Sequence, residues 1–225
     1  MGDVRVAAVV AGGSLSHTHS FRPPCYIDLL AVWLERLCLT PRWPGEGRGA
    51  RWPGSGGAPL EEIGLIAYTD GGCRGNPGPG AWGFLLVDRR RGVALERTGG
   101  EPQTTNNRME ISAALQVLES LKGSQRIEIR TDSRYLIDMS TKWIPGWKRK
   151  GWKRKGNEPV KNLDLVQRLD ELLRQHQVVW TWVAGHSGEP GNEYVDGLAN
   201  AAMDRLARRA DPASERRHEV SPVRV

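Results

Sequence analysis

Hydrophobic and polar residues follow two different periods along the middle of this 225-residue chain. The first is the period of a strand. Short apolar runs bounded by glycine and charged residues predict strands at residues 61–69, 81–88, 92–100, 126–131 and 178–185. The first three runs have short connections, which favours an antiparallel meander. Five strands are therefore predicted, and helical patterns separate the last two.

The second period is that of the α-helix. Thr105 is a suitable N-cap for the first helix, and Pro145-Gly146 is expected to stop the second. The predicted helices cover residues 105–122, 133–144, 162–175 and a last segment from about residue 192. The resulting order, βββαβααβα, predicts an α/β fold in which helices cover the faces of a mixed sheet.

Both ends of the chain lack this periodicity. Residues 41–59 are dense in Pro, Gly and Arg, residues 4–13 are too short to span a membrane, and residues 27–39 could form one isolated amphipathic helix. No methionine occurs between Met1 and Met109. We therefore expect a poorly structured extension or a mis-assigned start at residues 1–60, a folded domain at residues 61–207, and a disordered basic tail at residues 208–225.

The net charge of the chain indicates one class of binding partner. The chain has 32 Lys and Arg against 26 Asp and Glu, a net charge of +6, which favours a polyanionic partner but also fits a merely soluble basic protein. The three cysteines, Cys25, Cys38 and Cys73, lack metal-type spacing. They are expected to be reduced thiols of a cytoplasmic protein.

A glycine-rich segment, residues 68–83 (YTDGGCRGNPGPGAWG), follows the first apolar run. Its glycines approach the spacing of a dinucleotide-binding turn, but Pro77 and Pro79 interrupt them and a strand follows instead of a helix. A phosphate-binding turn is therefore disfavoured. The segment is expected to join strand to strand.

Four acidic residues stand at the ends of predicted elements. Asp70 and Asp132 end strands, Glu110 lies in a first helical turn on an apolar stripe, and Asp196 lies in the first turn of the last helix. Each has an ordinary explanation alone, as a turn residue or a partner of the helix dipole. Together they could converge on one crevice beside the sheet, because a carboxylate on an apolar stripe needs a cation. Four carboxylates suit Mg²⁺ or Mn²⁺ rather than zinc.

A basic repeat, GWKRKGWKRKG at residues 146–156, interleaves tryptophan with lysine and arginine. This pattern suits phosphate contacts from the basic side chains and stacking or sugar packing from Trp147 and Trp152. Alternatively, Trp143 and Trp147 pack this segment against its own helix. Both interpretations remain open, and they are compatible.

Five segments, taken in this order, resemble bacterial type 1 ribonuclease H: TDGGCRGNPGPGAWG, TNNRMEISAALQVLE, TDSRYLIDMSTKWI, GWKRKGWKRKGNEPVKNLDL and WVAGHSGEPGNEYVDGLAN. The resemblance covers residues 62–206. It implies a ribonuclease H-like fold with a five-stranded mixed sheet, in which an antiparallel meander is joined by parallel strands. It also implies an endonuclease that hydrolyses the RNA strand of RNA–DNA hybrids with two metal ions, leaving 5′-phosphate and 3′-hydroxyl ends.

The resemblance assigns roles residue by residue. The metal ligands would be Asp70, Glu110, Asp132 and Asp196, and the catalytic set would add His186. Alone, His186 is more simply interpreted as a loop histidine that forms hydrogen bonds, but the resemblance favours a proton shuttle or a role in product release. Hybrid contacts would come from Cys73, Asn76, Asn106, Asn107, Trp143, Trp147, Lys148, Arg149, Lys150, Trp152, Lys153 and Asn192. The glycine-rich segment would let the backbone approach a nucleic-acid strand beside Asp70, and the basic repeat would grip the DNA strand.

Two positions depart from the family pattern: Arg134 stands where many members have glutamine, and Tyr194 where arginine is frequent. Sequence preference and RNA contacts are the properties these could change. The competing functions are another metal-dependent nuclease or strand transferase of the same fold, and a hybrid-binding module without catalysis. We expect a monomer with no membrane partner, using Mg²⁺ or Mn²⁺.

Overall fold

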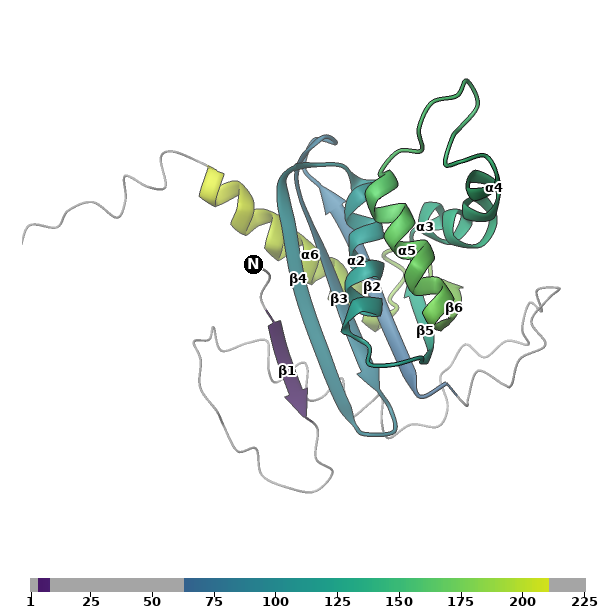
Figure 1. The fold of residues 1–225 in the computed structure, drawn as a ribbon. Helices are drawn as coiled ribbons and strands as arrows, with labels where there is room; N and C mark the ends of the chain where they lie inside the picture. The colour runs from purple at the N-terminus through teal and green to yellow at the C-terminus, as the bar shows by residue number, and fades with distance from the viewer. Residues whose placement is uncertain (1–3, 9–62, 211–225) are drawn as a thin grey trace, which may run out of the picture.

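The computed structural model describes residues 4–8 and 63–210, and in these residues a six-stranded mixed sheet lies between helices (Figure 1). The strand order is β1-β4-β3-β2-β5-β6. The strands are β1 (Val4–Ala8), β2 (Leu65–Cys73), β3 (Gly78–Asp88), β4 (Val93–Thr104), β5 (Arg126–Thr131) and β6 (Gln177–Trp182).

The predicted fold class is confirmed. β2, β3 and β4 form the antiparallel meander, β5 is parallel to β2, and β6 is parallel to β5. The sixth strand, β1, pairs antiparallel with β4 and is an addition to the five predicted strands. The predicted helix at residues 27–39, the linker at residues 41–59 and residues 211–225 of the tail lie outside the described residues.

Helices cover the two faces of the sheet (Figure 1). α2 and α5 pack together on one face, and α6 packs against β2, β3 and β4 on the other. The Thr105 side chain caps α2 as predicted, because its Oγ1 accepts from Arg108 N at 3.4 Å. The helices are α2 (Asn106–Ser120), α3 (Arg134–Asp138), the π-helical η2 (Met139–Trp143), α4 (Ile144–Arg149), α5 (Leu163–Gln175) and α6 (Pro190–Ala210).

One predicted helix boundary is wrong. Pro145 and Gly146 do not stop the helical segment, since both lie inside α4. A π-helical turn, η2, precedes α4, and Pro145 occupies the second position of the new helix. A proline is tolerated there because the first turn of a helix has no intrahelical acceptor for its N–H groups. The segment therefore continues into the basic repeat.

Three acidic residues lie deeper in their elements than predicted. Asp70 lies inside β2, because β2 and β3 continue through the glycine-rich segment and Asp70 pairs with Gly83. Glu110 is the fifth residue of α2, and Asp196 is the seventh of α6, which begins at Pro190. Only Asp132 directly follows its strand as predicted.

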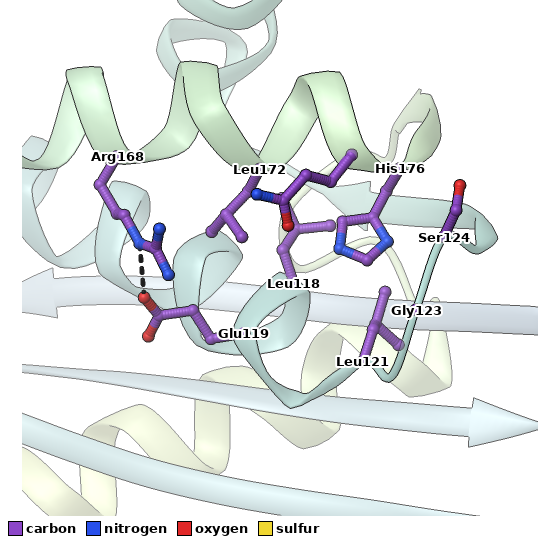
Figure 2. Close-up of a pocket in the computed structure, with 9 residues that line it drawn as sticks. Leu118, Glu119, Leu121, Gly123, Ser124, Arg168, Leu172 and His176 are labelled. Atoms are coloured by element: carbon purple, nitrogen blue, oxygen red, sulfur yellow. Dashed lines mark hydrogen bonds and ion pairs between the residues drawn. The ribbon is translucent and has the colours of Figure 1, made fainter.

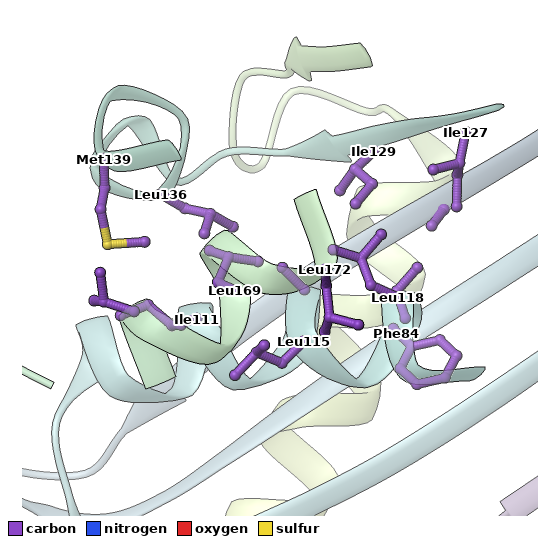
Figure 3. Close-up of a cluster of buried hydrophobic side chains, with 14 of the residues drawn as sticks. Phe84, Ile111, Leu115, Leu118, Ile127, Ile129, Leu136, Met139, Leu169 and Leu172 are labelled. Atoms are coloured by element: carbon purple, nitrogen blue, oxygen red, sulfur yellow. The ribbon is translucent and has the colours of Figure 1, made fainter. Parts of the chain in front are cut away.

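The main core fixes α2 against the sheet. Figure 3 shows Ile127 and Ile129 of β5 near Leu118 of α2 and Leu172 of α5, and all four side chains are buried. Burying each such side chain contributes roughly 1.5–3 kcal/mol, so this contact sets where α2 lies. None of the helices that the structure describes has both the length and the hydropathy of a membrane span.

Candidate active site

Three carboxylates from separate elements meet beside the sheet. Asp70 on β2, Glu110 on α2 and Asp132 after β5 each offer an oxygen atom within 4.8 Å of the others. Asp70 and Asp132 are neighbours because β2 and β5 are adjacent parallel strands. We call these three residues the carboxylate group.

Gly71 allows the third carboxylate, that of Glu110, to lie close to the other two. At Gly71, a Cβ atom would overlap the backbone of Met109 and Glu110. β2 and α2 therefore approach each other more closely than any side chain on residue 71 would allow. This approach places Glu110 next to Asp70.

The carboxylate group is electrostatically unfavourable without a cation. Burial raises the pKa of Asp70 to about 7, and the charges of Asp132 and Asp196 contribute to this rise. Burial also raises the pKa of Glu110 well above its usual range, as do the charges of Asp70 and Asp132. The buried Glu110 Oε2 has no hydrogen-bond partner in the described part of the chain.

This donor set fits a divalent cation. A positive ion would neutralise the repulsion among the three groups and give Glu110 Oε2 a partner. All the donors are carboxylate oxygens, which suit a hard cation. The carboxylate group is therefore built for divalent metal use.

The fourth predicted ligand, Asp196, lies outside this group of three. Its Oδ1 accepts a hydrogen bond from Asn200 Nδ2 at 2.9 Å, one helical turn along α6. Its charge nevertheless raises the pKa of Asp70, so it belongs to the same electrostatic environment.

Neighbouring groups hold Asp132 in place. Asn192, which is 2% exposed, donates through Nδ2 to Asp132 Oδ2 at 3.3 Å, and Trp182 Nε1 donates to the Asp132 carbonyl at 3.1 Å. A Cβ atom on Gly185 would lie 2.7 Å from Asp132 Oδ2, so glycine lets the following loop pass close to the carboxylate. The structure thus places Asn192, predicted as a hybrid contact, against a predicted metal ligand.

His186 lies in the loop between β6 and α6. Its side chain is exposed and its φ is +52°, in the left-handed region. Its charge lowers the pKa of Asp70, although less strongly than burial raises it. His186 is thus near the carboxylate group and open to solvent, as a proton-transferring side chain needs to be.

Three predicted hybrid contacts form one polar cluster where the β2–β3 turn meets α2. Asn106 Oδ1 accepts from Cys73 N at 2.7 Å, and Asn76 Oδ1 accepts from Asn106 N at 3.3 Å. The Cys73 thiol lies 3.6 Å from Asn76 Oδ1. Asn107 is exposed in the first turn of α2.

The glycines of the β2–β3 hairpin serve internal packing. A Cβ atom on Gly78 would overlap the Arg74 carbonyl, and one on Gly80 would overlap the Thr104 side chain. At these two positions and at Gly71, the protein's own atoms leave no room for a side chain, whether or not a ligand is bound. Gly75 differs, because its φ is +85° and the nearest atom to a Cβ would be 3.8 Å away. Nucleic-acid approach is therefore not what requires glycine at residues 71, 78 and 80.

The basic repeat combines packing with exposed charge. Trp147 and Trp152 pack against the main core, whereas Trp143 is 37% exposed and its ring centroid lies 5.8 Å from that of Trp147. Lys148 Nζ forms an ion pair with Asp170 of α5 at 2.8 Å, and Arg154 forms one with Glu158 at 2.7 Å. The exposed basic side chains of the repeat without an ion pair in the described region are Arg149, Lys150, Lys153 and Lys155.

The two departures from the family pattern lie in different places. The Arg134 guanidinium stacks 4.0 Å from the centroid of the Trp182 ring, whose N–H donates to the Asp132 carbonyl, so Arg134 is at the rim of the site. Tyr194 of α6 packs toward the sheet and its hydroxyl hydrogen-bonds the Glu96 carboxylate. Tyr194 is therefore an internal residue of the α6 face.

Sequence reasoning missed a second set of charges near the site. Glu128 and Arg130 of β5, with Glu189 before α6, form a largely buried ion-pair network. The available signal was the RIEIRT segment, where the charged residues Arg126, Glu128 and Arg130 alternate with buried isoleucines and so must share the opposite face.

A pocket in the described structure lies away from this site. It measures about 480 Å³ and lies between the ends of α2 and α5. Figure 2 shows the Arg168–Glu119 ion pair at one side and His176 at the other. None of its lining residues belongs to the carboxylate group.

Comparisons with known proteins identify the family. The RNase H family model matches residues 62–204. The chain is 49% identical over 152 residues to Ribonuclease H of Alcanivorax borkumensis, covering 67% of this chain and 98% of that protein. It is 53% identical over 144 residues to Ribonuclease HI of a Pseudomonas aeruginosa strain, covering 64% and 96%.

Solved structures give the same similarity in three dimensions. LC9-RNase H1, a type 1 RNase H with the type 2 active-site motif, aligns with a TM-score of 0.58 at 32% identity, covering 68% of this chain and 83% of that one. The N-terminal RNase H domain of a Mycobacterium tuberculosis protein aligns with a TM-score of 0.52 at 26% identity, covering 66% and 99%.

Proposed function

The chain belongs to the RNase H family, and from that premise we propose that it is an endonuclease that hydrolyses the RNA strand of RNA–DNA hybrids. The products are a 5′-phosphate and a 3′-hydroxyl end. The observation that carries this proposal is the carboxylate group, in which Asp70, Glu110 and Asp132 each offer an oxygen atom within 4.8 Å of the others.

We propose that these three residues and Asp196 hold two Mg²⁺ ions, with Mn²⁺ as a substitute. Bound divalent ions of this kind supply an activated water and stabilise the charge that develops on the leaving oxygen. Asp70 has the central role, because the charges of Asp132 and Asp196 both act on it. Asn192 and Trp182 orient Asp132 through its Oδ2 and carbonyl oxygen.

His186 is proposed to transfer a proton near the reacting phosphate. Its exposed position beside Asp70 supports this, and imidazole changes charge near neutral pH. Gly188, two residues after His186, has a φ of +81°, a conformation that glycine adopts without strain. His186 therefore assists the reaction without holding a metal.

Strand recognition is divided between two regions. The polar cluster of Cys73, Asn76 and Asn106, together with Asn107, is proposed to read the RNA strand, whose 2′-hydroxyls lie in a wide minor groove. The exposed charges of the basic repeat, together with Trp143 before it, are proposed to contact the DNA backbone. All these groups come from one chain, so a monomer suffices. Cytoplasmic location stays a prediction.

One experiment tests the function. The purified protein is incubated with labelled RNA–DNA hybrid, duplex RNA, duplex DNA and each single strand, with Mg²⁺ or with a chelator. We expect cleavage of the RNA strand of the hybrid only, and none with chelator. Equal cleavage of duplex DNA would favour another nuclease of this fold, and hybrid binding without cleavage would favour a binding module.

A further inference from the structure

A largely buried ion-pair network lies on the same face of the sheet as α6. It occupies the part of that face that β5 and β6 form. Glu128, whose side chain is 3% exposed, receives two charge-assisted hydrogen bonds from Arg130, at 2.9 and 3.1 Å. Thr181 Oγ1 donates to the same carboxylate at 2.8 Å. Glu128 is therefore fully compensated inside the protein.

Arg130 extends the network away from the strand. Its Nη1 lies 3.3 Å from the Tyr68 hydroxyl and 3.9 Å from a Glu189 carboxylate oxygen. Burial alone would lower the pKa of Arg130, but hydrogen bonding to Glu128 and nearby negative charges raise it overall. Arg130 thus stays charged and joins β5 and β2 to the residue that precedes α6.

Glu189 connects the network to the start of α6. Its Oε2 accepts from Asn192 N at 2.6 Å, as an N-cap side chain does. Its backbone carbonyl accepts from Glu193 N at 3.0 Å. A Cβ atom on Gly191 would overlap the Tyr68 ring, so the first turn of α6 lies directly on that ring.

The start of α6 carries groups that act on the carboxylate group. Asn192 donates to Asp132, and Asp196 follows one turn later. Glu189 also ends the loop that carries His186, three residues earlier. The position of these three groups therefore depends on where Glu189 is held.

We propose that Arg130 and Glu189 are positioning residues, which hold the His186 loop and the first turn of α6 in register with the metal-binding carboxylates. His186 itself stays exposed, so the network fixes the end of the loop and leaves the histidine free to move. This inference rests on the proposed function, because it assigns a purpose to the same site.

The test uses the full-length double variant Glu128→Gln/Arg130→Met, which removes both charges of the buried pair and leaves none unpaired at residue 128 or 130. The matched control is Glu119→Gln/Arg168→Met, which removes an exposed ion pair of 3.0 Å between α2 and α5. Both are assayed at a temperature where circular dichroism shows full folding.

Two readouts are expected to change together. In metal-free protein, hydrogen–deuterium exchange should accelerate at the amides of Gly188, Asn192 and Glu193, while α5 exchanges as in wild type. With Mg²⁺, kcat should fall by about 10-fold or more while KM for the hybrid changes little, as is typical when the partner of a metal-ligating side chain is removed. The control variant should match wild type in both.

A second pair of variants keeps the test decisive if the double variant fails to fold. Glu189→Ala should lower kcat, and Glu189→Gln should restore part of it because its amide oxygen still accepts from Asn192 N. Wild-type kcat and local exchange in Glu189→Ala would overturn the proposal, as would faster exchange throughout the protein with unchanged kcat. If wild type itself cleaves no hybrid, the proposed function fails, whereas the exchange measurement still decides whether the network holds the loop.

Discussion

Two neighbouring regions of this protein bury carboxylates, and the groups that surround these carboxylates differ in charge between the two regions. In the network, Glu128 faces the Arg130 guanidinium and the Thr181 hydroxyl. In the carboxylate group, Asp70 and Glu110 face each other and Asp132, and their pKa values rise. β5 contributes to both regions. Glu128 and Arg130 of β5 belong to the network on the α6 face, and Asp132, which follows the strand, belongs to the carboxylate group.

The difference separates structural charges from functional ones. A buried charge with an internal partner needs nothing from solution, and removing that partner is costly. A buried group of like charges lowers the free energy of unfolding, and no group inside the protein offsets this loss. It therefore indicates a ligand of opposite charge. The same substitution, carboxylate to amide, should therefore have opposite effects in the two regions.

The largest expected effect is on hydrolysis. Asp70→Asn and Asp132→Asn should each reduce cleavage of hybrid on the order of 10³-fold, because each removes charge from the cation site while preserving volume. Hybrid affinity should remain, since phosphate contacts lie elsewhere. Single-turnover cleavage and a gel-shift titration measure the two quantities.

Asp88→Asn is the matched control for this prediction. Asp88 ends β3, and its Oδ1 accepts from the Arg90 and Arg91 amides, a role that asparagine can keep. It should cleave like wild type. Turnover near wild type in Asp70→Asn would show that the carboxylate group is not the catalytic centre.

The second effect is on stability, and its sign differs between the regions. The raised pKa of Asp70 means that the metal-free protein holds this proton more tightly when folded. Its stability should therefore fall as pH rises from about 4 to about 7. At pH 7 without metal, Asp70→Asn should raise the free energy of unfolding on the order of 2–4 kcal/mol. Glu128→Gln should lower it by about 3–5 kcal/mol, because Arg130 loses its buried partner.

Urea denaturation at pH 4, 5.5 and 7 measures this difference. The gain from Asp70→Asn should shrink toward zero near pH 4, where the carboxyl of the folded wild type is already protonated. Adding Mg²⁺ should stabilise wild type more than the variant, because only the intact group binds the ion fully. A destabilised Asp70→Asn protein at pH 7 would contradict the contrast between the two regions.

The sequence predicted the elements better than their ends. Apolar periodicity located the five strands of the domain, because burial on the sheet faces imposes it. The pattern ended β2 too early, at Asp70, since Gly71 and Gly72 carry no side chain that could show alternation. It also ended the second helix at Pro145, which is tolerated because it lies in the first turn of α4.

The expected convergence of carboxylates beside the sheet is seen for three of the four residues. Asp70, Glu110 and Asp132 belong to recognisable local motifs, so their convergence could be expected from the resemblance. The network could not, because Glu128 and Arg130 are close in sequence to each other but far from Glu189. The packing of α6 on the sheet, which includes the contact of Gly191 with Tyr68, brings that residue to them.

The third effect extends the comparison to the basic repeat. Lys148 and Arg154 have internal partners, whereas Lys150 and Lys153 are exposed without an ion pair among the described residues. Lys150→Ala/Lys153→Ala should therefore weaken hybrid binding and reduce the log–log salt slope by roughly 0.7–0.9 for each phosphate that the variant no longer neutralises. Lys148→Ala/Arg154→Ala removes the same charge but should change the slope less and lower the melting temperature more.

Binding isotherms at several salt concentrations compare the two variants. Cleavage at saturating substrate should survive in both, because these interactions are common to the ground and transition states. An equal decrease of slope in both variants would mean that the internal ion pairs open when hybrid binds. An unchanged slope in both would place the DNA strand on another surface.

The smallest effect is expected from removing a segment that contributes no residue to the carboxylate group or to the network. In the described structure, β1 pairs with β4, two strands away from β2, and contributes nothing to the carboxylate group or the network. A chain that begins at Glu61 should therefore cleave hybrid at the wild-type rate and show the same opposite signs for Asp70→Asn and Glu128→Gln. Its melting temperature should fall only slightly, through the removal of one five-residue edge pairing. Reduced cleavage with an unchanged melting temperature would instead show that residues 1–60 take part in substrate binding, because the fold that holds both regions would then be intact.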